Sequence, residues 1–179
     1  MPAKVSGKKW SAAEIKAHTA RIQAATEKFK HEGKKKHFLA IKPAEIEKKF
    51  KRVNSPFMVS LGWNDTAPGG TVSLSVGVYN PDPTDAGSLF VYVAIGSGNV
   101  DPVTGTYLLN VDPRFPRLTE PKFFGLTLAS GASTQLDFAL EVPAAVEATN
   151  YLGNATLMQF NWFDTGTFLD RANFVFNVS

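Results

Sequence analysis

The chain has 179 residues, of which 44% are hydrophobic and 20% are charged, and it contains no cysteine. These values are typical of one globular domain with a substantial core. The absence of cysteine excludes disulfides, thiolate metal ligands and a cysteine nucleophile. No apolar run approaches the ~20 residues of a transmembrane helix, and no secretory signal peptide is recognisable. We therefore expect no membrane span, and either a cytoplasmic protein or one exported without such a signal.

Charge divides the chain into two parts. Residues 1–53 hold 15 Lys and Arg against five Glu, a net charge of +10, whereas the remaining 126 residues hold four basic and 11 acidic side chains, a net charge of −7. All three histidines also lie in the first part. We therefore predict a basic N-terminal arm, residues 1–53, followed by an acidic domain, residues 54–179.

The arm has the pattern of two helices. Ser11 and Glu14 form a capping box, and the good helix formers that follow predict a helix over about 12–31, ended by Gly33. Its large apolar residues recur every seven positions, as Ile15, Ile22 and Phe29. This narrow stripe predicts a docking face for the main domain or for a partner. A second helix, about 43–51, begins at a proline, a residue favoured at the first helical position.

Clustered cations give the arm a candidate binding surface for nucleic acid or an anionic membrane, because phosphates attract lysine. The candidate residues are Lys34, Lys35, Lys36, Lys48, Lys49, Lys51 and Arg52. Interleaved glutamates and the low arginine count favour the alternative, a solvated helical surface that keeps the protein soluble.

From residue 54 the pattern changes to the alternation of strands, bounded by Gly, Pro, Asn and Asp. The run 89–95 is apolar on both faces, which indicates a central strand or one covered by the N-terminal helix. Residues 129–132 read as a hairpin link between two strands. We predict a mainly β protein, an antiparallel immunoglobulin-like β-sandwich of about eight strands, preceded by the basic helical arm. The expected strands are about 57–63, 71–79, 88–96, 105–111, 122–128, 133–142, 154–163 and 171–178.

Two segments carry a family resemblance: GGTVSLSVGVYNPDPTDAGSLFVYVAI, residues 69–95, and GLTLASGASTQLDFALEVP, residues 125–143. In both, a strand flanked by glycine leads into a turn and a further strand. The pattern resembles bacterial cell-adhesion-related (CARDB-like) domains of the immunoglobulin-like class, over about residues 57–178. This resemblance implies a binding or spacer module, of a kind usually found outside the cell.

The predicted domain is poor in catalytic groups, since it contains no histidine and only one lysine. Its carboxylates lie mainly in predicted loops, where they could supply oxygen ligands to calcium, although no EF-hand spacing is present. Tryptophans beside polar residues could instead form a sugar platform. The candidate ligand loops contain Trp63, Asp65, Asp82, Asp85, Asp101, Trp162 and Asp164. We expect no enzyme, no cofactor and no metal site beyond this calcium hypothesis.

The leading hypothesis is a non-enzymatic binding or structural module for a protein partner or for self-assembly. Edge strands and exposed aromatic residues would make the contact, and the basic arm of one copy would complement the acidic sandwich of its neighbour, so that salt weakens association. Two alternatives stay open. One is a coat-like protein that packages nucleic acid through residues 1–53, and the other is a carbohydrate- or calcium-binding sandwich.

Overall fold

The computed structural model describes residues 9–52, 55–95, 122–148, 150–160 and 166–179. Two helices and eight strands form along this part of the chain. In order they are α1 (Ala12–Gly33), β1 (His37–Ala40), α2 (Pro43–Arg52), β2 (Phe57–Trp63), β3 (Thr71–Tyr79), β4 (Ala86–Ile95), β5 (Lys122–Leu128), β6 (Ser133–Glu141), β7 (Asn150–Phe160) and β8 (Gly166–Asn177).

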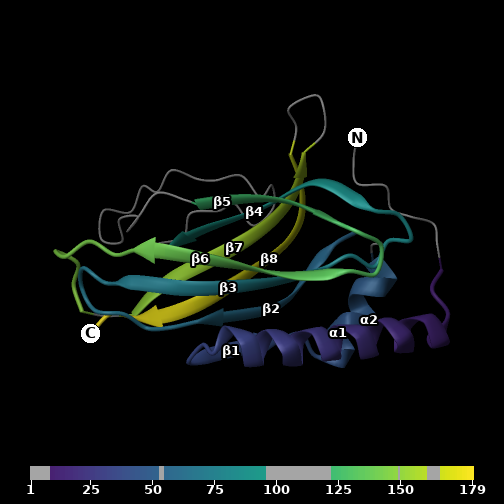
Figure 1. The fold of residues 1–179 in the computed structure, drawn as a ribbon, viewed down its shortest axis with the longest axis horizontal. Coiled ribbons are helices and arrows are strands. Elements are labelled where there is room, and N and C mark those ends of the chain that lie inside the picture. The colour runs from purple at the N-terminus through teal and green to yellow at the C-terminus, as the bar shows by residue number, and fades with distance from the viewer. Residues whose placement is uncertain (1–8, 53–54, 96–121, 149, 161–165) are drawn as a thin grey trace.

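The strands form two antiparallel sheets of four, with the orders β1-β2-β3-β6 and β5-β4-β7-β8 (Figure 1). Alternate side chains of both sheets meet in one apolar core, in which Leu74, Val76, Leu89, Leu157 and Phe176 are almost completely buried. The predicted sandwich is therefore confirmed. β4 is a central strand, as the apolar run 89–95 indicates, and the sheet that the helices cover is the other one.

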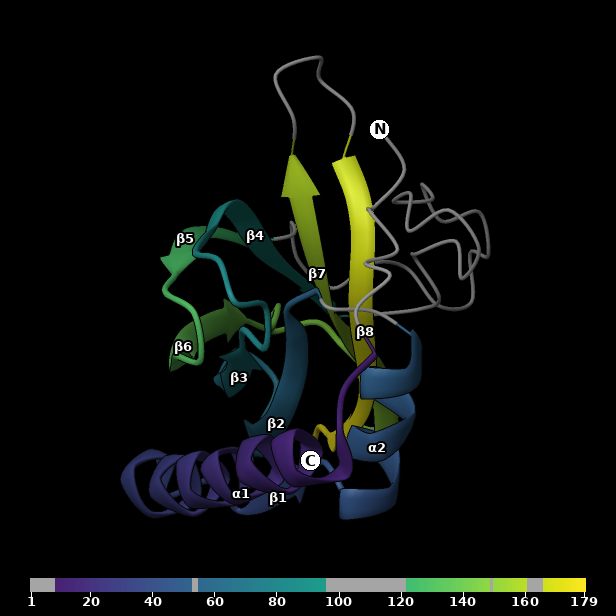
Figure 2. The same cartoon turned by 90° about the vertical axis from the view of Figure 1, so that its right-hand side faces the viewer.

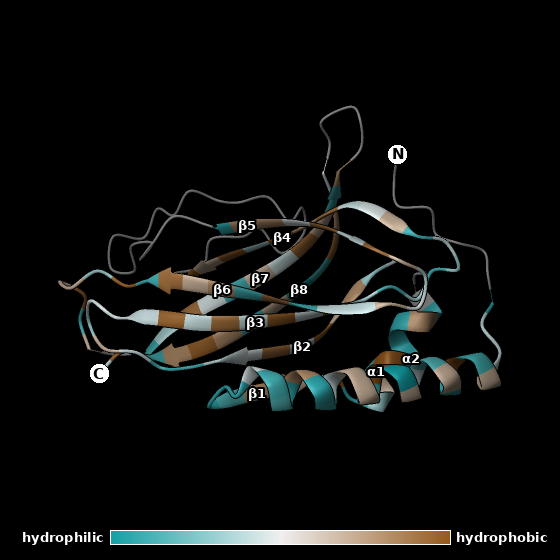
Figure 3. Cartoon of the chain, viewed as in Figure 1, coloured by the Kyte–Doolittle hydropathy of each residue, from teal (hydrophilic) through white to brown (hydrophobic). Residues whose placement is uncertain are grey.

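A second core lies on the outer face of the first sheet, where α1 and α2 pack (Figure 2). Ile22 and Phe29 of α1 and Ile46 and Phe50 of α2 meet residues of β2 and β3. In Figure 3, hydrophobic and hydrophilic residues alternate along both helices, as expected of helices with one buried face. Since both faces of β2 are covered, all seven of its residues are buried. The molecule thus has three layers, one of helices and two of strands.

Polar contacts accompany this packing. The Tyr79 hydroxyl on β3 shares a hydrogen bond with the His18 ring on α1. Burial raises the pKa of Tyr79, against the opposing effect of the Arg21 guanidinium. The tyrosine therefore stays protonated at neutral pH and connects the end of β3 to the helix.

The ends of α1 follow from local sequence. The Ser11 side chain accepts from the Glu14 N–H at 3.1 Å, and the Glu14 carboxylate accepts from the Ser11 N–H at 2.8 Å, which confirms the capping box. At the other end Gly33 is still helical, and Lys34 adopts the left-handed conformation with φ 48°. A lysine therefore occupies the position that usually favours glycine.

Most strands lie where the alternation predicts them. One expected strand lies outside the described residues, and one observed strand was not predicted. The strand expected at 105–111 falls outside the described residues. β1 was not predicted as a strand, because its four residues form an unalternating apolar run. It pairs with β2 from His37↔Trp63 to Ala40↔Ser60 and so adds the end of the arm to the sheet.

The link at 129–132 was predicted as a hairpin, and this prediction is wrong: β5 and β6 belong to different sheets. The turn itself forms, with Ala132 N–H bonded to Ala129 C=O at 3.0 Å. Asn80 explains the difference. It is fully buried, and its side-chain amide donates to the carbonyls of Leu128 and Ala129, so it joins this turn to the β3–β4 crossing between the sheets.

Gly77 of β3 provides a test of the second core. A Cβ atom there would lie 2.2 Å from Ser60 Oγ and 2.9 Å from the Phe29 ring. We expect Gly77→Ala to lower the free energy of unfolding by about 1–3 kcal/mol, because Phe29 must shift. Urea denaturation measures this, with Gly87→Ala as the control, since nothing lies within 4 Å of a Cβ at Gly87. Equal effects of both changes would contradict the packing.

Lys34 provides a second test. Lys34→Gly is expected to raise the free energy of unfolding by about 0.5–1 kcal/mol, because glycine adopts a positive φ without steric cost. Thermal denaturation measures the change, and Lys30→Gly, placed inside α1, should instead destabilise. A destabilised Lys34→Gly variant would contradict the left-handed cap.

Candidate functional site

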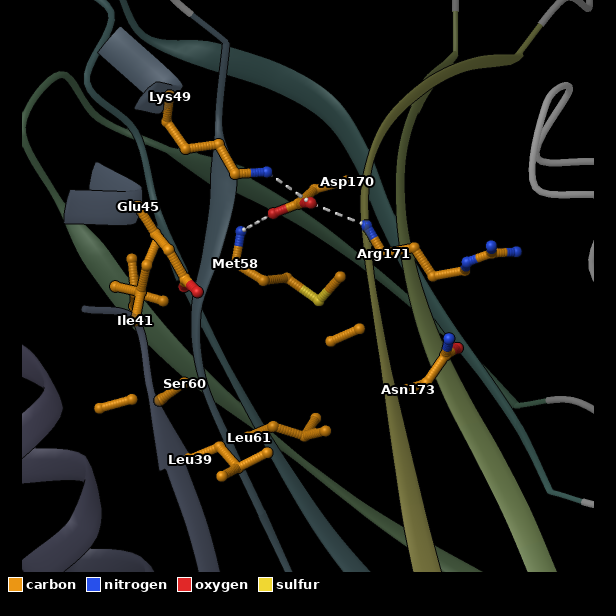
Figure 4. A pocket seen from close by; sticks show the side chains of 13 residues that line it. Leu39, Ile41, Glu45, Lys49, Met58, Ser60, Leu61, Asp170, Arg171 and Asn173 are labelled. Carbon is orange, nitrogen blue, oxygen red and sulfur yellow. Dashed lines mark hydrogen bonds and ion pairs between the residues drawn. The ribbon is translucent and has the colours of Figure 1, made fainter. Parts of the chain in front are cut away.

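A groove opens where β1 and β2 of one sheet face β8, the edge strand of the other (Figure 4). Its volume is about 220 Å³. Leu39, Ile41, Met58 and Leu61 contribute apolar surface, and Glu45, Lys49, Arg171 and Asn173 contribute polar groups. The groove therefore combines an apolar floor with a polar rim.

The gap exists because β1 is short. It pairs only with the second half of β2, and after it the Ile41 N–H bonds to the Val59 carbonyl at 2.8 Å before the chain turns into α2. β2 bulges at this point, with Val59 as the extra residue between Met58 and Ser60. No described strand therefore lies beside the first half of β2 on this side, and α2 lies next to β2 and β8 (Figure 2).

One end of the groove is closed by Asp170 of β8. Its carboxylate accepts from Lys49 Nζ at 2.8 Å, from the Met58 N–H at 2.9 Å and from the Arg171 N–H at 2.9 Å. The side chain of Asp170 is only 12% exposed, so this pair is partly shielded from water. It connects α2, β2 and β8 at a single carboxylate.

A second carboxylate, Asp65, follows β2 and lies beyond the residues that line the groove. Its carboxylate accepts from Lys36 Nζ at 2.9 Å and from the Asn177 N–H at 2.9 Å, and it pairs with His37 Nε2 at 3.0 Å. These hydrogen bonds hold the pKa of Asp65 well below its usual range. The bond from Lys36 has the largest effect, followed by those from Asn177 and His37. Beside it, Trp63 Nε1 donates to the Val175 carbonyl at 3.0 Å.

The groove is better suited to an inserted side chain than to a metabolite. Small-molecule pockets usually span about 300–1,000 Å³, and this groove is smaller. An apolar floor inside a polar rim is the arrangement found in protein interfaces. Leu39 is 56% exposed at this site, a large fraction for a leucine.

The predicted arm cations have diverse partners. Lys36 and Lys49 pair with Asp65 and Asp170 of the sandwich, and Lys35 Nζ donates to Ser73 Oγ at 2.6 Å. Lys51 pairs with Glu47 of its own helix at 3.2 Å. Lys34 and Lys48 are exposed, and the side chain of Arg52 lies outside the description. Four of the seven predicted cations, Lys35, Lys36, Lys49 and Lys51, therefore have partners within the chain.

The predicted docking face lies against the sandwich. Ile22 and Phe29 are buried in the second core, and Ile15 packs against it. The helix lies along the sheet and does not project from it (Figure 1).

The candidate aspartates that the structure describes lie at opposite ends of β3. Asp65 lies beyond one end of β3, whereas Asp82 and Asp85 lie beyond the other end. Asp82 accepts from the Thr84 N–H within its own turn, and Asp85 accepts from the Ser130 N–H. Asp101, Trp162 and Asp164 lie outside the described residues. Within the described ranges, no group of three or more His, Asp or Glu could hold a metal ion.

Trp63 does not form an exposed platform. It is 7% exposed, and its ring packs on His37 and Phe174. In the described part of the chain, neither helix is long and apolar enough to cross a membrane.

Apart from Lys49, which was a candidate arm cation, the residues around the groove were not predicted as a site. Asp170 was expected in a loop, but it lies within β8, and its partner Lys49 is 121 residues away in sequence. Leu39 and Met58 read as ordinary apolar residues. Only the opposite net charges of residues 1–53 and residues 54–179 indicated that side chains of these two segments would pair.

The structure is similar to that of the C-terminal domain of wzt, with a TM-score of 0.50, 10% identity, and 80% of this chain and 77% of that chain covered. It is also similar to the CARDB domain of the PF1109 protein from Pyrococcus furiosus, solved in complex with di-metal ions, with a TM-score of 0.42, 18% identity, and 70% and 86% covered. No protein-family model matches, and no curated protein matches in sequence.

The topology and the likeness to the wzt domain define the class: the chain is an antiparallel immunoglobulin-like β-sandwich with a helical layer. At these identities the likeness concerns the fold alone. It provides no direct evidence of enzymatic activity.

Asp65 gives a pH-dependent prediction. Its folded-state pKa is depressed, so its stabilisation is present above the unfolded pKa of about 4 and is lost as the pH falls below that value. Asp65→Asn should lower the free energy of unfolding by about 1–2 kcal/mol at neutral pH, and the difference from wild type should shrink toward about pH 2.

Urea denaturation across this pH range measures both curves. Asp82→Asn is the control, because that carboxylate bonds within its own turn. A constant difference between the Asp65→Asn variant and wild type at all pH values would contradict the assignment.

Proposed function

We propose that the chain is a non-enzymatic protein-binding module whose groove between β1, β2 and β8 holds an apolar side chain from an extended segment of a partner. The observation that carries the proposal is the half-exposed Leu39 beside an apolar floor and a polar rim. Interfaces place buried apolar anchors in such small pockets.

An extended segment suits the groove because the wall formed by β8 is a sheet edge. β2 contacts this edge through the Met58–Asp170 and Trp63–Val175 hydrogen bonds, and no described strand pairs with the edge between them. A partner strand could therefore bond to the backbone of β8 while one of its side chains enters the groove. Glu45 and Asn173, which flank the groove from α2 and β8 (Figure 4), supply polar contacts at the rim.

Charge complementarity between the arm and the sandwich already operates within one chain, at Lys36–Asp65 and Lys49–Asp170. These pairs reduce the charge left for salt-dependent association between copies. Packaging of nucleic acid by residues 1–53 stays a prediction, to be tested by the 260/280 nm absorbance ratio of the purified protein. Carbohydrate or calcium binding also stays a prediction, and the separation of Asp65 from Asp82 and Asp85 gives it no support.

The test selects ligands on the whole chain. A displayed library of random peptides is panned against wild type and counter-selected against Leu39→Lys, which changes an exposed residue of the groove. We expect the enriched peptides to share an aromatic or branched apolar anchor. Their affinity should fall at least about tenfold, ~1.4 kcal/mol, on Leu39→Lys. Leu152→Lys is the matched control, since Leu152 is an exposed leucine on β7.

Methionine methyl signals locate the binding. The chain has three methionines; Met58 lines the groove, and Met158 lies on β7, beside Phe90 of β4. In a chain with ¹³C-labelled methionine methyls, a bound peptide should shift the Met58 signal and leave Met158 unchanged. Failure to enrich peptides over the counter-selection, or a shift confined to Met158, would contradict the proposal.

A further inference from the structure

β5 is an edge strand with an unusual surface. Phe123 and Phe124 are 66% and 47% exposed, and the first four residues of the strand are all exposed. The Phe123 ring tilts against Tyr92 of β4, and the Phe124 ring meets Phe138 of β6 edge-on. As neighbours in a strand, the two phenylalanines point to opposite faces of the sheet.

Soluble proteins usually protect their sheet edges with charges, short strands or covering elements. The other edges described here have such protection. β1 has four residues, β6 carries Asp137 and Glu141, and β8 is hydrogen-bonded to β2 at Asp170 and at Val175. β5 has seven residues, without proline, and its single charge is Lys122 at the start. Among the described strands, β5 is therefore the edge without protection.

We propose that β5 pairs with β5 of a second copy of this chain, antiparallel across a two-fold axis near Gly125. In this arrangement Phe124 of each copy lies opposite Leu126 of the other, and Phe123 lies opposite Thr127. The two Lys122 side chains lie at opposite ends of the paired strands. A parallel arrangement would instead place Lys122 beside Lys122, and like charges directly opposite each other destabilise a strand pair.

The pairing explains why apolar side chains are found on both faces of an edge. Joining the two sheets extends the outer face over Phe123 and the inner face over Phe124, and removes both from water. The contact is apolar apart from the backbone hydrogen bonds, so the dimer should resist salt. Association through the basic arm, by contrast, would weaken as salt rises.

The dimer also determines where the two grooves lie. Since β5 and β8 are the opposite edges of one sheet, pairing at β5 makes a sheet of eight strands with a β8 at each end. Seven strand spacings separate the two β8 strands by about 34 Å. This consequence rests on the proposed function, which it extends to two partner segments held at once; the dimer itself does not depend on it.

Sedimentation of the full chain tests the dimer. Wild type is expected at twice the 19.4 kDa of one chain, with the same dissociation constant at about 50 mM and about 500 mM salt. Phe123→Lys should raise the dissociation constant at least about tenfold, because lysine protects an edge. Thr127→Lys repeats the test at an exposed residue whose change leaves the apolar contacts of β5 intact.

Val175→Lys is the matched control, an exposed apolar residue on β8, and should stay dimeric. A monomer at high concentration, a dimer unaffected by both β5 variants, or dissociation by salt would overturn the proposal. A wild type that is dimeric but binds no peptide would contradict the proposed function of the groove and would not affect the proposed dimer.

Discussion

The burial of α1 and α2 against the outer face of the first sheet is the interaction on which the rest of the structure depends. Phe57, Val59 and Tyr79 lie on that face, and without the helices they would be exposed to water. Their burial with Ile22, Phe29, Ile46 and Phe50 contributes roughly 1.5–3 kcal/mol for each large side chain. Gly77 leaves room for the Phe29 ring. The segment 1–53 is therefore distinct in charge from the sandwich, but its two helices form one of the three layers and its β1 belongs to the first sheet.

Two carboxylates then connect the layers along one side of the sandwich. Asp65 joins the start of β1 to the end of β8, and Asp170 joins α2 to β2 and β8. Removal of one partner from a shielded pair leaves an unpaired charge, which costs more than the pair itself contributes. Asp170 and Lys49 also line the groove, so one of the contacts that attach the arm shapes the candidate binding site. The exposed edge at β5 lies on the opposite side of the second sheet.

Much of the fold could be predicted because its signals are local. Alternation predicted β2, β3 and β5 at their observed bounds, and the seven-residue spacing of Ile15, Ile22 and Phe29 indicated the buried stripe. β1 could not be predicted, since its strand character comes from pairing with β2. The hairpin prediction at 129–132 was wrong, because a tight turn can join strands of one sheet or of two, and buried Asn80 decides between them. The groove depends on Asp170 meeting Lys49, a contact that no local pattern contains.

The integration of α1 into the sandwich is tested most directly by native-state hydrogen exchange of the full chain. Amides between Ile22 and Phe29 should exchange with the same opening free energy as those of β3, because the helix and the sheet face share one core and unfold together. Exchange of the α1 amides at a much lower free energy, while β3 stays protected, would show that the helix detaches from an intact sandwich and would contradict the three-layer fold.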